Sequence, residues 1–410
     1  MRPTLTDASD LDSQDPLADF KAHFALPEGV LYLDGNSLGA QPRAAREALD
    51  ATRDQWRDAL VGGWNQGWFD APERLGDLLA PLIGARAGEV LVSDSITLNL
   101  FKLLGYITER QGRARTVILS EGGNFPADGY IAEGFCRSAG FTHRFLPEGA
   151  PLEAHLDAQV AVVVLSQVNY RTGQLRDMAE TTRRVHASGA EVIWDLAHSA
   201  GALAVDLAGS EVRYAVGCTY KYLNGGPGAP GFLYVRRDAQ LAGWQPLSGW
   251  HGHAQPFAFD ANYAPANGMT RFRTGTHSAL AYAPLEASLR LWQQVDMAAL
   301  RAKSLALADL FRACLTDLFE THGIEDITPP PAQRGSQVGL VQREHGYAIV
   351  QALISRGVIG DYREPGLMRF GFTPLYLSHV DVWHAADEFR KVMESAEYRD
   401  PHFQTRTEVT

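Results

Sequence analysis

Short apolar runs alternate with amphipathic stretches along the chain from residue 71 onward. The apolar runs lie at residues 90–92, 117–119, 160–165, 191–194, 214–218 and 231–235, and the helical stretches at residues 72–83, 96–109, 125–138 and 178–188. Apolar runs that are bounded by turns and separated by helices are typical of a mostly parallel sheet covered on both faces. The pattern therefore predicts an α/β fold, in which ligands bind beyond the carboxyl ends of the strands.

The segments on either side of this unit follow other patterns. Residues 1–28 have the pattern of a loose lead-in. Residues 30–39 have the pattern of a short strand that runs into a turn, and residues 43–60 have the pattern of an amphipathic helix. Further along, we expect long helices at residues 275–295 and 297–320, a proline-rich break at 329–331, strands at 338–341 and 367–372, and helices at 347–355 and 380–393. These elements predict an N-terminal segment (1–50), a large α/β domain (51–296) and a small C-terminal α+β domain (297–410).

Composition narrows the classes of partner. The 410 residues carry a formal net charge of −11, which argues against nucleic acid or an anionic membrane as the main partner. The longest wholly apolar run, residues 160–165, is far too short to span a bilayer, and residues 1–20 are acidic with no apolar signal region. The three cysteines lie far apart without a CxxC pair, so we expect no disulfide framework, no metal site and a cytoplasmic location.

The most informative stretch is residues 218–228, in which Lys221 stands between Tyr220 and Tyr222 at the end of an apolar run. A turn rich in Gly and Pro follows it, which favours a shaped loop. A lysine walled by aromatic rings is partly desolvated, and desolvation suits an amine that must attack a carbonyl. The alternative is an ordinary surface lysine whose stem packs on its neighbours.

A second candidate, Asp195, ends the preceding strand and is followed by His198. A carboxylate at the end of a buried strand is costly unless a cation or hydrogen-bond donors meet it. A strand-terminal Asp followed by a strand-terminal Lys is the arrangement that holds pyridoxal phosphate, with the Lys as Schiff-base amine and the Asp keeping the ring nitrogen protonated. Taken singly, Asp195 could be a helix N-cap and His198 a core or rim histidine.

A phosphate would need a cradle of its own, and residues 93–97 offer hydroxyls and free N–H groups at the start of a helix. Phe125 could stack on a flat ring or belong to the core, and Ser166 is a further hydroxyl at a strand end. No GxGxxG follows a strand and no GxxxxGK[ST] is present, so nucleotide phosphate binding lacks support.

Separated motifs, in the same order along the chain, resemble the kynureninase family: residues 32–39, 125–128, 194–198, 220–222 and 248–250. The resemblance runs from about residue 30 to residue 395. It implies a fold-type I pyridoxal-phosphate enzyme related to class V aminotransferases and cysteine desulfurases. The implied reaction is hydrolytic Cβ–Cγ cleavage of L-kynurenine, with its 3-hydroxy form left open, to anthranilate and L-alanine in tryptophan catabolism.

The resemblance also implies roles for individual residues. It makes Lys221, Tyr220 and Asp195 catalytic, with Lys221 as the Schiff-base lysine and Asp195 as partner of the pyridinium nitrogen. The residues implied to surround the cofactor are Ile96, Thr97, Phe125, Asp128, Ser166, Asp195, His198, Tyr220 and Lys221, with Trp250 and Thr276 reaching in from the partner subunit of a homodimer. Arg369 matches the arginine that grips the substrate's α-carboxylate, and Asn36 and Trp64 are further substrate-binding candidates. Where the family has a hydroxyl residue this chain has Ala127, which leaves one polar contact near the phosphate in doubt.

Other functions on the same fold are weighed by what they would require. A cysteine desulfurase needs a reactive cysteine on a mobile loop, whereas Cys136 and Cys314 fall inside predicted helices and Cys218 ends a strand. A class V aminotransferase shares the cofactor chemistry and stays the alternative. A non-catalytic regulator would need an appended partner or DNA-binding element, and the acidic chain offers none.

Overall fold

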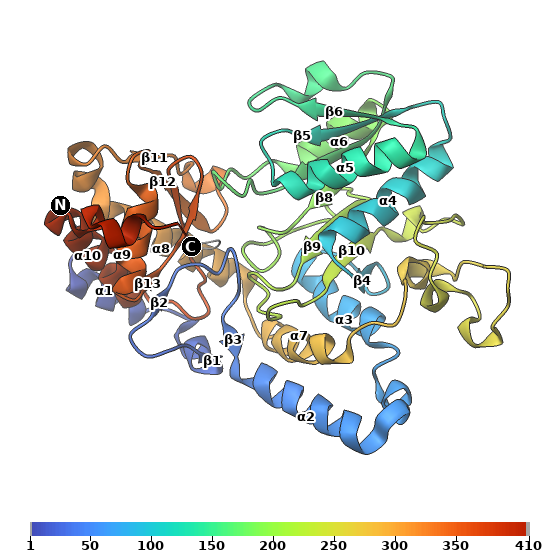
Figure 1. The fold of residues 1–410 in the computed structure, drawn as a ribbon, viewed down its shortest axis with the longest axis horizontal. Coiled ribbons are helices and arrows are strands. Elements are labelled where there is room, and N and C mark those ends of the chain that lie inside the picture. The colour runs from blue at the N-terminus through green and yellow to red at the C-terminus, as the bar shows by residue number, and fades with distance from the viewer. Residues whose placement is uncertain (1, 407–410) are drawn as a thin grey trace.

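The computed structural model describes residues 2–406, so the outermost ends of the predicted terminal domains, residue 1 and residues 407–410, lie outside the described part. A seven-stranded sheet forms the centre of the larger part of the structure (Figure 1). In spatial order its strands are β4 (Val90–Val92), β10 (Gly231–Val235), β9 (Tyr214–Cys218), β8 (Glu191–Asp195), β7 (Val160–Ser166), β5 (Val117–Glu121) and β6 (Thr142–Leu146). The strands from β9 to β6 are parallel, and β10 alone runs antiparallel to both of its neighbours. The predicted mostly parallel sheet is therefore confirmed.

The antiparallel direction of β10 matters for the site. Its first residue, Gly231, pairs with Cys218, the last residue of β9. Gly231 therefore lies at the edge of the sheet where the parallel strands end.

One strand of this sheet, β6, escaped prediction. It is one of the two edge strands, and its residues Thr142 to Phe145 are exposed or only partly buried. A strand that is half exposed lacks the continuous apolar run by which the buried strands were recognised.

Helices cover both faces of the sheet, as predicted. On one face α4 (Ile96–Gln111) and α5 (Pro126–Ala139) pack on Val162 and Val164, and on the other face α3 (Ala71–Leu79), α6 (Met178–Ala187) and α7 (Ala279–Trp292) share a core with Val163 and Leu165. The alternation along β7 follows from the two-residue period of a strand. α2 (Arg43–Ala59) lies along α7 at the lower edge of the view in Figure 1.

The C-terminal unit is a small α+β structure, as predicted. Its helices are α8 (Met297–Thr321), α9 (Gly346–Ser355) and α10 (His379–Ser395). Its antiparallel sheet has the order β11 (Glu325–Asp326), β12 (Gln337–Val341), β15 (Leu367–Gly371) and β14 (Asp361–Arg363). The exact boundaries of the three predicted domains stay a prediction.

The expectation of a loose lead-in was wrong. The segment contains α1 (Leu5–Asp12), which begins with a capping box between Thr4 and Asp7 and lies beside α10 (Figure 1). Asp12 accepts hydrogen bonds from the backbone N–H groups of His379 and Val380 at the start of α10. Because Ala8 is the one buried residue of α1, the apolar period is too weak to predict this helix.

A short strand pair ties the N-terminal segment to the C-terminal unit. β2 (Leu31–Tyr32) pairs in parallel with β13 (Val358–Ile359), whereas β1 (Phe24–Ala25) pairs with β3 (Gln41–Pro42) inside the N-terminal segment. The Gly371 N–H donates to the Leu33 carbonyl at 2.7 Å. The turn after β2 is thereby held against β15. Within residues 2–406, no helix combines the length and apolarity needed to cross a membrane.

Candidate active site

A cavity of about 290 Å³ lies where the parallel strands end. Most of the predicted site residues line it, namely Asn36, Ile96, Thr97, Phe125, Asp128, Ser166, Asp195, His198, Tyr220, Lys221 and Arg369. They come from segments between residues 36 and 369, which meet because loops that follow parallel strands emerge at one edge of the sheet. The cavity is therefore the candidate active site.

Lys221 lies in this cavity beside a neutral histidine. Its Nζ atom is 2.9 Å from Nε2 of His198 and 6.0 Å from the centre of the Tyr220 ring. Burial lowers the pKa of His198 well below its usual range, and the charge of Lys221 lowers it further. A neutral imidazole can accept a hydrogen bond from the Lys221 amine, which holds that amine in place.

Two buried carboxyl groups, Asp195 and Asp128, face each other across the floor of the cavity. Burial raises the pKa of Asp195, an effect that the Lys221 charge partly offsets, and burial together with Asp195 raises the pKa of Asp128 well above its usual range. Asp195 Oδ1 accepts from the Ala197 N–H at 2.9 Å, Oδ2 accepts a long hydrogen bond of 3.5 Å from the Ser166 hydroxyl, and the Asp195 and Asp128 carboxyl groups share a hydrogen bond. A cation held beside Asp195 would therefore stabilise the charged form of this buried carboxyl group.

Asn124 links these groups and was not predicted. Its Nδ2 donates to Asp128 Oδ2 at 3.0 Å, and its Oδ1 accepts from the Ser166 hydroxyl at 2.7 Å. It lies in the short loop between β5 and α5, so its place just after a strand end was the one signal that could have found it.

The N-terminus of α4 forms another wall. Ser95 caps the helix by accepting from the Leu98 N–H, and the first-turn N–H groups of Ile96 and Thr97 have no partner inside the helix. A Cβ built on Gly231 would lie 3.1 Å from the Ile96 nitrogen, so glycine is what permits this close approach. Free N–H groups at a helix start attract an anion such as phosphate.

Aromatic rings border the cavity beside this helix. Phe125 is 51% exposed and meets the Tyr170 ring edge-on, with centroids 5.4 Å apart. A flat ligand could stack on Phe125. Ala127, the position where a hydroxyl was expected, also lines the cavity.

Arg369 lies opposite, anchored in a polar network. Its Nε donates to Asp361 Oδ1 at 2.7 Å, a second donor reaches Asp361 Oδ2, and Nη1 donates to the Tyr170 carbonyl at 2.6 Å. Burial alone would lower the pKa of Arg369, but its bonds to Asp361 and the Asp361 charge outweigh that effect and raise it. Asn36 is fully buried beside this network, and its side-chain amide has no hydrogen-bond partner among the described residues.

Tyr220 borders the cavity next to Cys218. The Cys218 side chain and burial raise the pKa of the Tyr220 hydroxyl above its usual range, so the hydroxyl stays protonated near neutrality. Cys136, Cys218 and Cys314 are all buried and unpaired. None has the exposed, cation-rich surroundings of a reactive thiol.

The structure does not bring Trp64, Trp250 or Thr276 to this cavity. Instead Trp64 packs edge-on against His277 and His251, at 5.3 and 6.2 Å between ring centroids, and Trp250 lies 4.1 Å from His251. Thr276 is exposed next to His277, and Trp250 is 42% exposed. These three predicted residues therefore form one surface cluster with His251 and His277.

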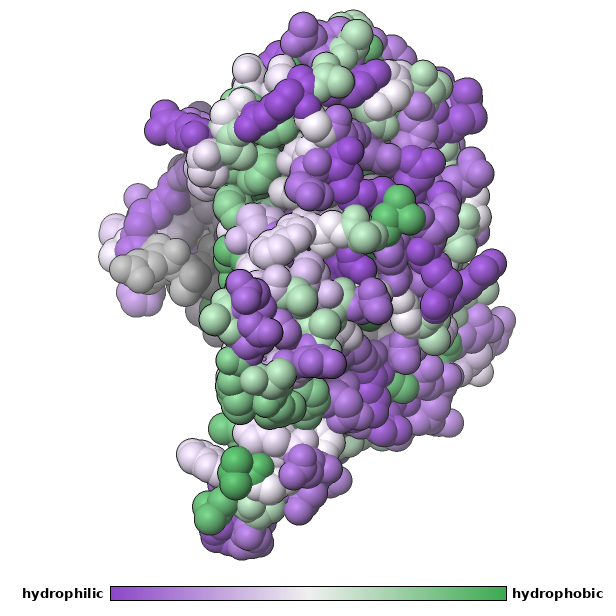
Figure 2. Space-filling view, turned by 90° about the vertical axis from the view of Figure 1, so that its right-hand side faces the viewer, coloured by the Kyte–Doolittle hydropathy of each residue, from purple (hydrophilic) through white to green (hydrophobic). Residues whose placement is uncertain are grey.

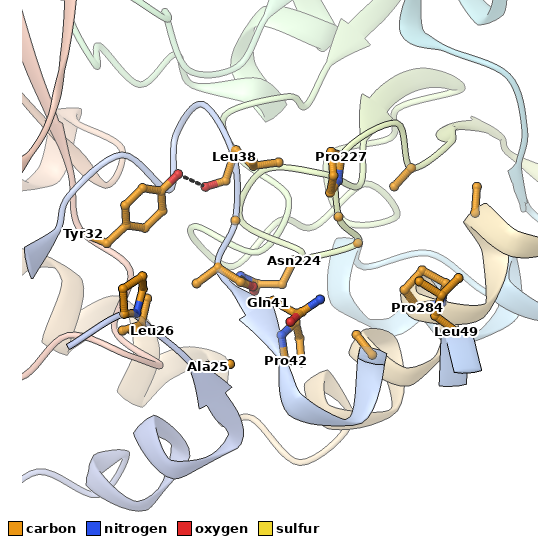
Figure 3. Close-up of a pocket in the computed structure, with 18 of the residues that line it drawn as sticks. Ala25, Leu26, Tyr32, Leu38, Gln41, Pro42, Leu49, Asn224, Pro227 and Pro284 are labelled. Atoms are coloured by element: carbon orange, nitrogen blue, oxygen red, sulfur yellow. Dashed lines mark hydrogen bonds between the residues drawn. The ribbon is translucent and has the colours of Figure 1, made fainter. Parts of the chain in front are cut away.

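A larger apolar cavity of about 790 Å³ lies on the other side of the loop that follows Lys221 (Figure 3). Figure 3 shows its lining coming from the N-terminal segment (Leu26, Tyr32, Pro42), from helices (Leu49, Pro284) and from the loop itself (Pro227). It contains no charged side chain, and so no lysine to bond an aldehyde and no carboxylate to meet a protonated ring nitrogen. The chemistry belongs to the smaller cavity.

The smaller cavity fits pyridoxal phosphate. Lys221 can bond the aldehyde, the buried Asp195 carboxyl matches a protonated ring nitrogen, and the free N–H groups of α4 match the phosphate. Among residues 2–406, no group of three or more His, Cys, Asp or Glu side chains could hold a metal ion.

Comparisons with known proteins agree with this geometry. The family model described as "Kynureninase C-terminal domain" matches residues 300–389. A protein named kynureninase from Burkholderia pseudomallei is 49% identical over 415 residues, covering 99% of this chain and 100% of that protein. A kynureninase from Pseudomonas fluorescens is 47% identical over the same shares. The chain belongs to the kynureninase family.

Solved structures of other proteins have a similar fold at low sequence identity. The cysteine desulfurase CsdA from Escherichia coli has a TM-score of 0.78 at 19% identity, covering 92% of this chain and 98% of that chain. A C-DES mutant with glycine covalently linked to its PLP cofactor has a TM-score of 0.77 at 22% identity, covering 90% and 98%. The predicted fold-type I architecture is confirmed.

Family membership also confirms the predicted enzyme class and its function, the cleavage of kynurenine. The cysteine desulfurase or class V aminotransferase alternative is a relationship of fold, at far lower identity.

Proposed function

We propose that the cavity at Lys221 binds pyridoxal phosphate and there cleaves the Cβ–Cγ bond of L-kynurenine to give anthranilate and L-alanine. The observation that carries the proposal is the sharing of one buried cavity by Lys221, Asp195 and the open N-terminus of α4. Lysine, carboxylate and anion site are the three contacts that this cofactor needs.

Each wall of the cavity would hold one part of the cofactor. When bound, pyridoxal phosphate supplies an electron sink that stabilises negative charge at the substrate's α-carbon. Asp195 would keep the ring nitrogen protonated, and Ser166, Asp128 and His198 would border the ring. Phe125 would cover one face of the ring, while Ile96 and Thr97 would donate their N–H groups to the phosphate.

Proton transfer would fall to Lys221 and Tyr220. Once released by the incoming substrate amine, Lys221 Nζ would remove the α-proton, held in position by the neutral His198 imidazole 2.9 Å away. Tyr220, whose hydroxyl stays protonated, would donate a proton in the later steps, after water has attacked the side-chain ketone.

The substrate would be oriented by its carboxylate. Arg369 is fixed by Asp361 with donors left over, and the unpartnered amide of Asn36 lies within reach of the same end of the cavity. A guanidinium held rigidly before the ligand arrives loses little entropy on binding.

The direct test is to incubate the cofactor-loaded protein with L-kynurenine and follow the fluorescence of anthranilate. We expect anthranilate and alanine in equal amounts. Release of sulfur from L-cysteine, or formation of a keto acid from kynurenine without anthranilate, would support the related chemistries instead. The same assay with 3-hydroxykynurenine measures which form is preferred.

We further propose a homodimer in which Trp250, Thr276 and Trp64 complete the partner's active site. Large apolar side chains are exposed around this cluster, among them Trp250 at 42% and Val61 at 81%. Figure 2 shows apolar atoms gathered on the lower part of the face turned to the viewer. A second copy of the chain would cover this surface and the open apolar cavity of Figure 3.

Mixing two inactive variants tests the shared site. Lys221→Ala and Trp250→Ala, once their subunits exchange, should recover about a quarter of wild-type activity, because each mixed dimer has one intact site. An inactive mixture with proven subunit exchange would place Trp250 in its own subunit's site. The test is informative once Trp250→Ala alone has been found severely impaired.

We also propose that the enzyme acts in the cytoplasm, in tryptophan catabolism by the kynurenine pathway. Its three unpaired, buried cysteines are typical of proteins from a reducing compartment.

A further inference from the structure

Three charged residues of β14 and β15 border the substrate end of the cavity. Asp361 pairs with Arg369 across the two strands, and Arg363 lies two residues beyond Asp361. Residues two apart on a strand point to the same face, so Arg363 joins the Asp361–Arg369 pair on that face. Arg363 and Arg369 both line the cavity.

Most of the hydrogen-bonding capacity of Arg369 is already used. Asp361 takes one edge of its guanidinium, and the Tyr170 carbonyl takes Nη1 at 2.6 Å. Asp361 also cancels the charge of Arg369. The Arg369 guanidinium is therefore well oriented, but its charge is balanced by Asp361.

Arg363 differs in both respects. Its Nη2 lies 2.9 Å from Asp361 Oδ2 and its Nη1 donates to the Tyr362 carbonyl at 2.9 Å, while the side chain stays 38% exposed. A guanidinium has five N–H donors, so several remain for a ligand. Two guanidinium groups beside one carboxylate leave one positive charge, which matches the single charge of an α-carboxylate.

Asp34, the other acid near this group, does not cancel that charge fully. Burial and the neighbouring Asp361 raise the pKa of Asp34 to about 7. Near neutrality Asp34 is therefore partly protonated.

We propose that Arg363 is a second residue that binds the substrate's α-carboxylate, supplying the unbalanced positive charge while Arg369 supplies the orientation. The enzyme would thereby select amino acids over amines. This inference rests on the proposed function of the cavity, which it extends to a residue outside the predicted site.

The test compares two ligands that differ only in the carboxylate. The affinities of L-alanine and ethylamine for the cofactor-loaded protein are measured from the change in visible absorbance, which needs no turnover of kynurenine. In Arg363→Gln the preference for alanine should fall roughly 10- to 100-fold. Arg363→Lys should keep most of it, because the charge remains.

Arg343→Gln is the matched control. Arg343 belongs to the same unit, is 71% exposed and lies outside the cavity, with Glu325 4.0 Å away. Its loss should leave the preference for alanine unchanged.

A double variant distinguishes an effect of the Arg363 charge from a structural role in which Arg363 only holds Asp361 and Arg369 in place. If Arg363 acts by its charge, adding Asp361→Asn to Arg363→Gln should restore part of the preference, since Arg369 alone then supplies the net positive charge. If Arg363 merely braces Asp361 and Arg369, the double variant should bind alanine no better than Arg363→Gln.

Two results would overturn the inference: an unchanged alanine preference in Arg363→Gln, or no recovery in a folded double variant. Should the double variant not fold, the alanine preference of Arg363→Gln decides alone. Failure of wild-type protein to cleave kynurenine while it still prefers alanine would count against the proposed function and not against Arg363.

Discussion

Replacing Asp195 by asparagine should change the stability of the protein in opposite directions without and with the cofactor. Without cofactor, the change removes a buried carboxyl group whose pKa is raised by burial. The new amide can still accept from the Ala197 N–H and can hydrogen-bond to the facing Asp128 carboxyl group. Replacing a buried carboxyl group in this way should stabilise the cofactor-free protein by roughly 1–3 kcal/mol.

The pH dependence fixes the sign of this effect. Because the folded-state pKa of Asp195 is raised, the folded protein binds a proton more readily than the unfolded chain. Wild-type stability should therefore fall as the pH rises above the ordinary Asp value of about 3.9 toward the raised pKa, and the variant should lack this part of the fall. The gain from the substitution should be larger at pH 8 than at pH 5.

With cofactor, the sign should reverse, because the variant loses the charge that faces the protonated ring nitrogen. Each tenfold loss of affinity removes about 1.4 kcal/mol of cofactor-linked stabilisation, so the reversal requires an affinity more than about 150-fold weaker to outweigh a gain of about 3 kcal/mol. Turnover should fall by orders of magnitude.

Thermal unfolding with and without saturating pyridoxal phosphate measures both effects, and Asp238→Asn, on the surface, controls for the loss of any carboxylate. A cofactor-free variant less stable than wild type, or one with wild-type turnover, would refute the reasoning and make Asp195 a cap.

Three further changes test the surroundings of the site. Gly231→Ala should weaken pyridoxal phosphate binding about tenfold in an absorbance titration, because its Cβ would crowd the Ile96 nitrogen 3.1 Å away; unchanged affinity would remove the phosphate from this wall. Asp34→Asn should abolish the loss of stability between about pH 4 and pH 7 that a pKa of about 7 implies, a gain of up to about 4 kcal/mol at pH 8, and parallel denaturation curves would contradict it. Asp94→Asn leaves the fully buried Lys102 without its counter-ion and should cost about 3–5 kcal/mol in denaturant unfolding, part of which Lys102→Met should restore.

The part of the site built by strand ends could be predicted from the sequence. Ser166, Asp195 and Lys221 each follow an apolar run, and parallel strands deliver such residues to one edge of a sheet. For these residues the apolar run alone was sufficient, because the residue that follows a parallel strand always lies at the same edge of the sheet.

The substrate end could not be predicted in the same way. Arg363 reaches the cavity only because the C-terminal unit docks against the large sheet, and no period in the sequence encodes that docking. The turn carrying Asn36 is placed by the two-residue strand pair β2–β13, which is too short to recognise. Trp64 follows α2 in the chain and lies outside the cavity, in the surface cluster with His251 and His277, so its predicted contact with the substrate stays a prediction.

The most direct test of the account is to identify the lysine that carries the cofactor. Reducing the pyridoxal-phosphate-loaded protein with borohydride makes the bond between cofactor and amine permanent, and peptide mass mapping then locates it. The account predicts one modified residue, Lys221, and no stable label in Lys221→Ala. A label on another lysine, such as Lys102 or Lys303, or a protein that takes no label at saturating cofactor, would contradict it.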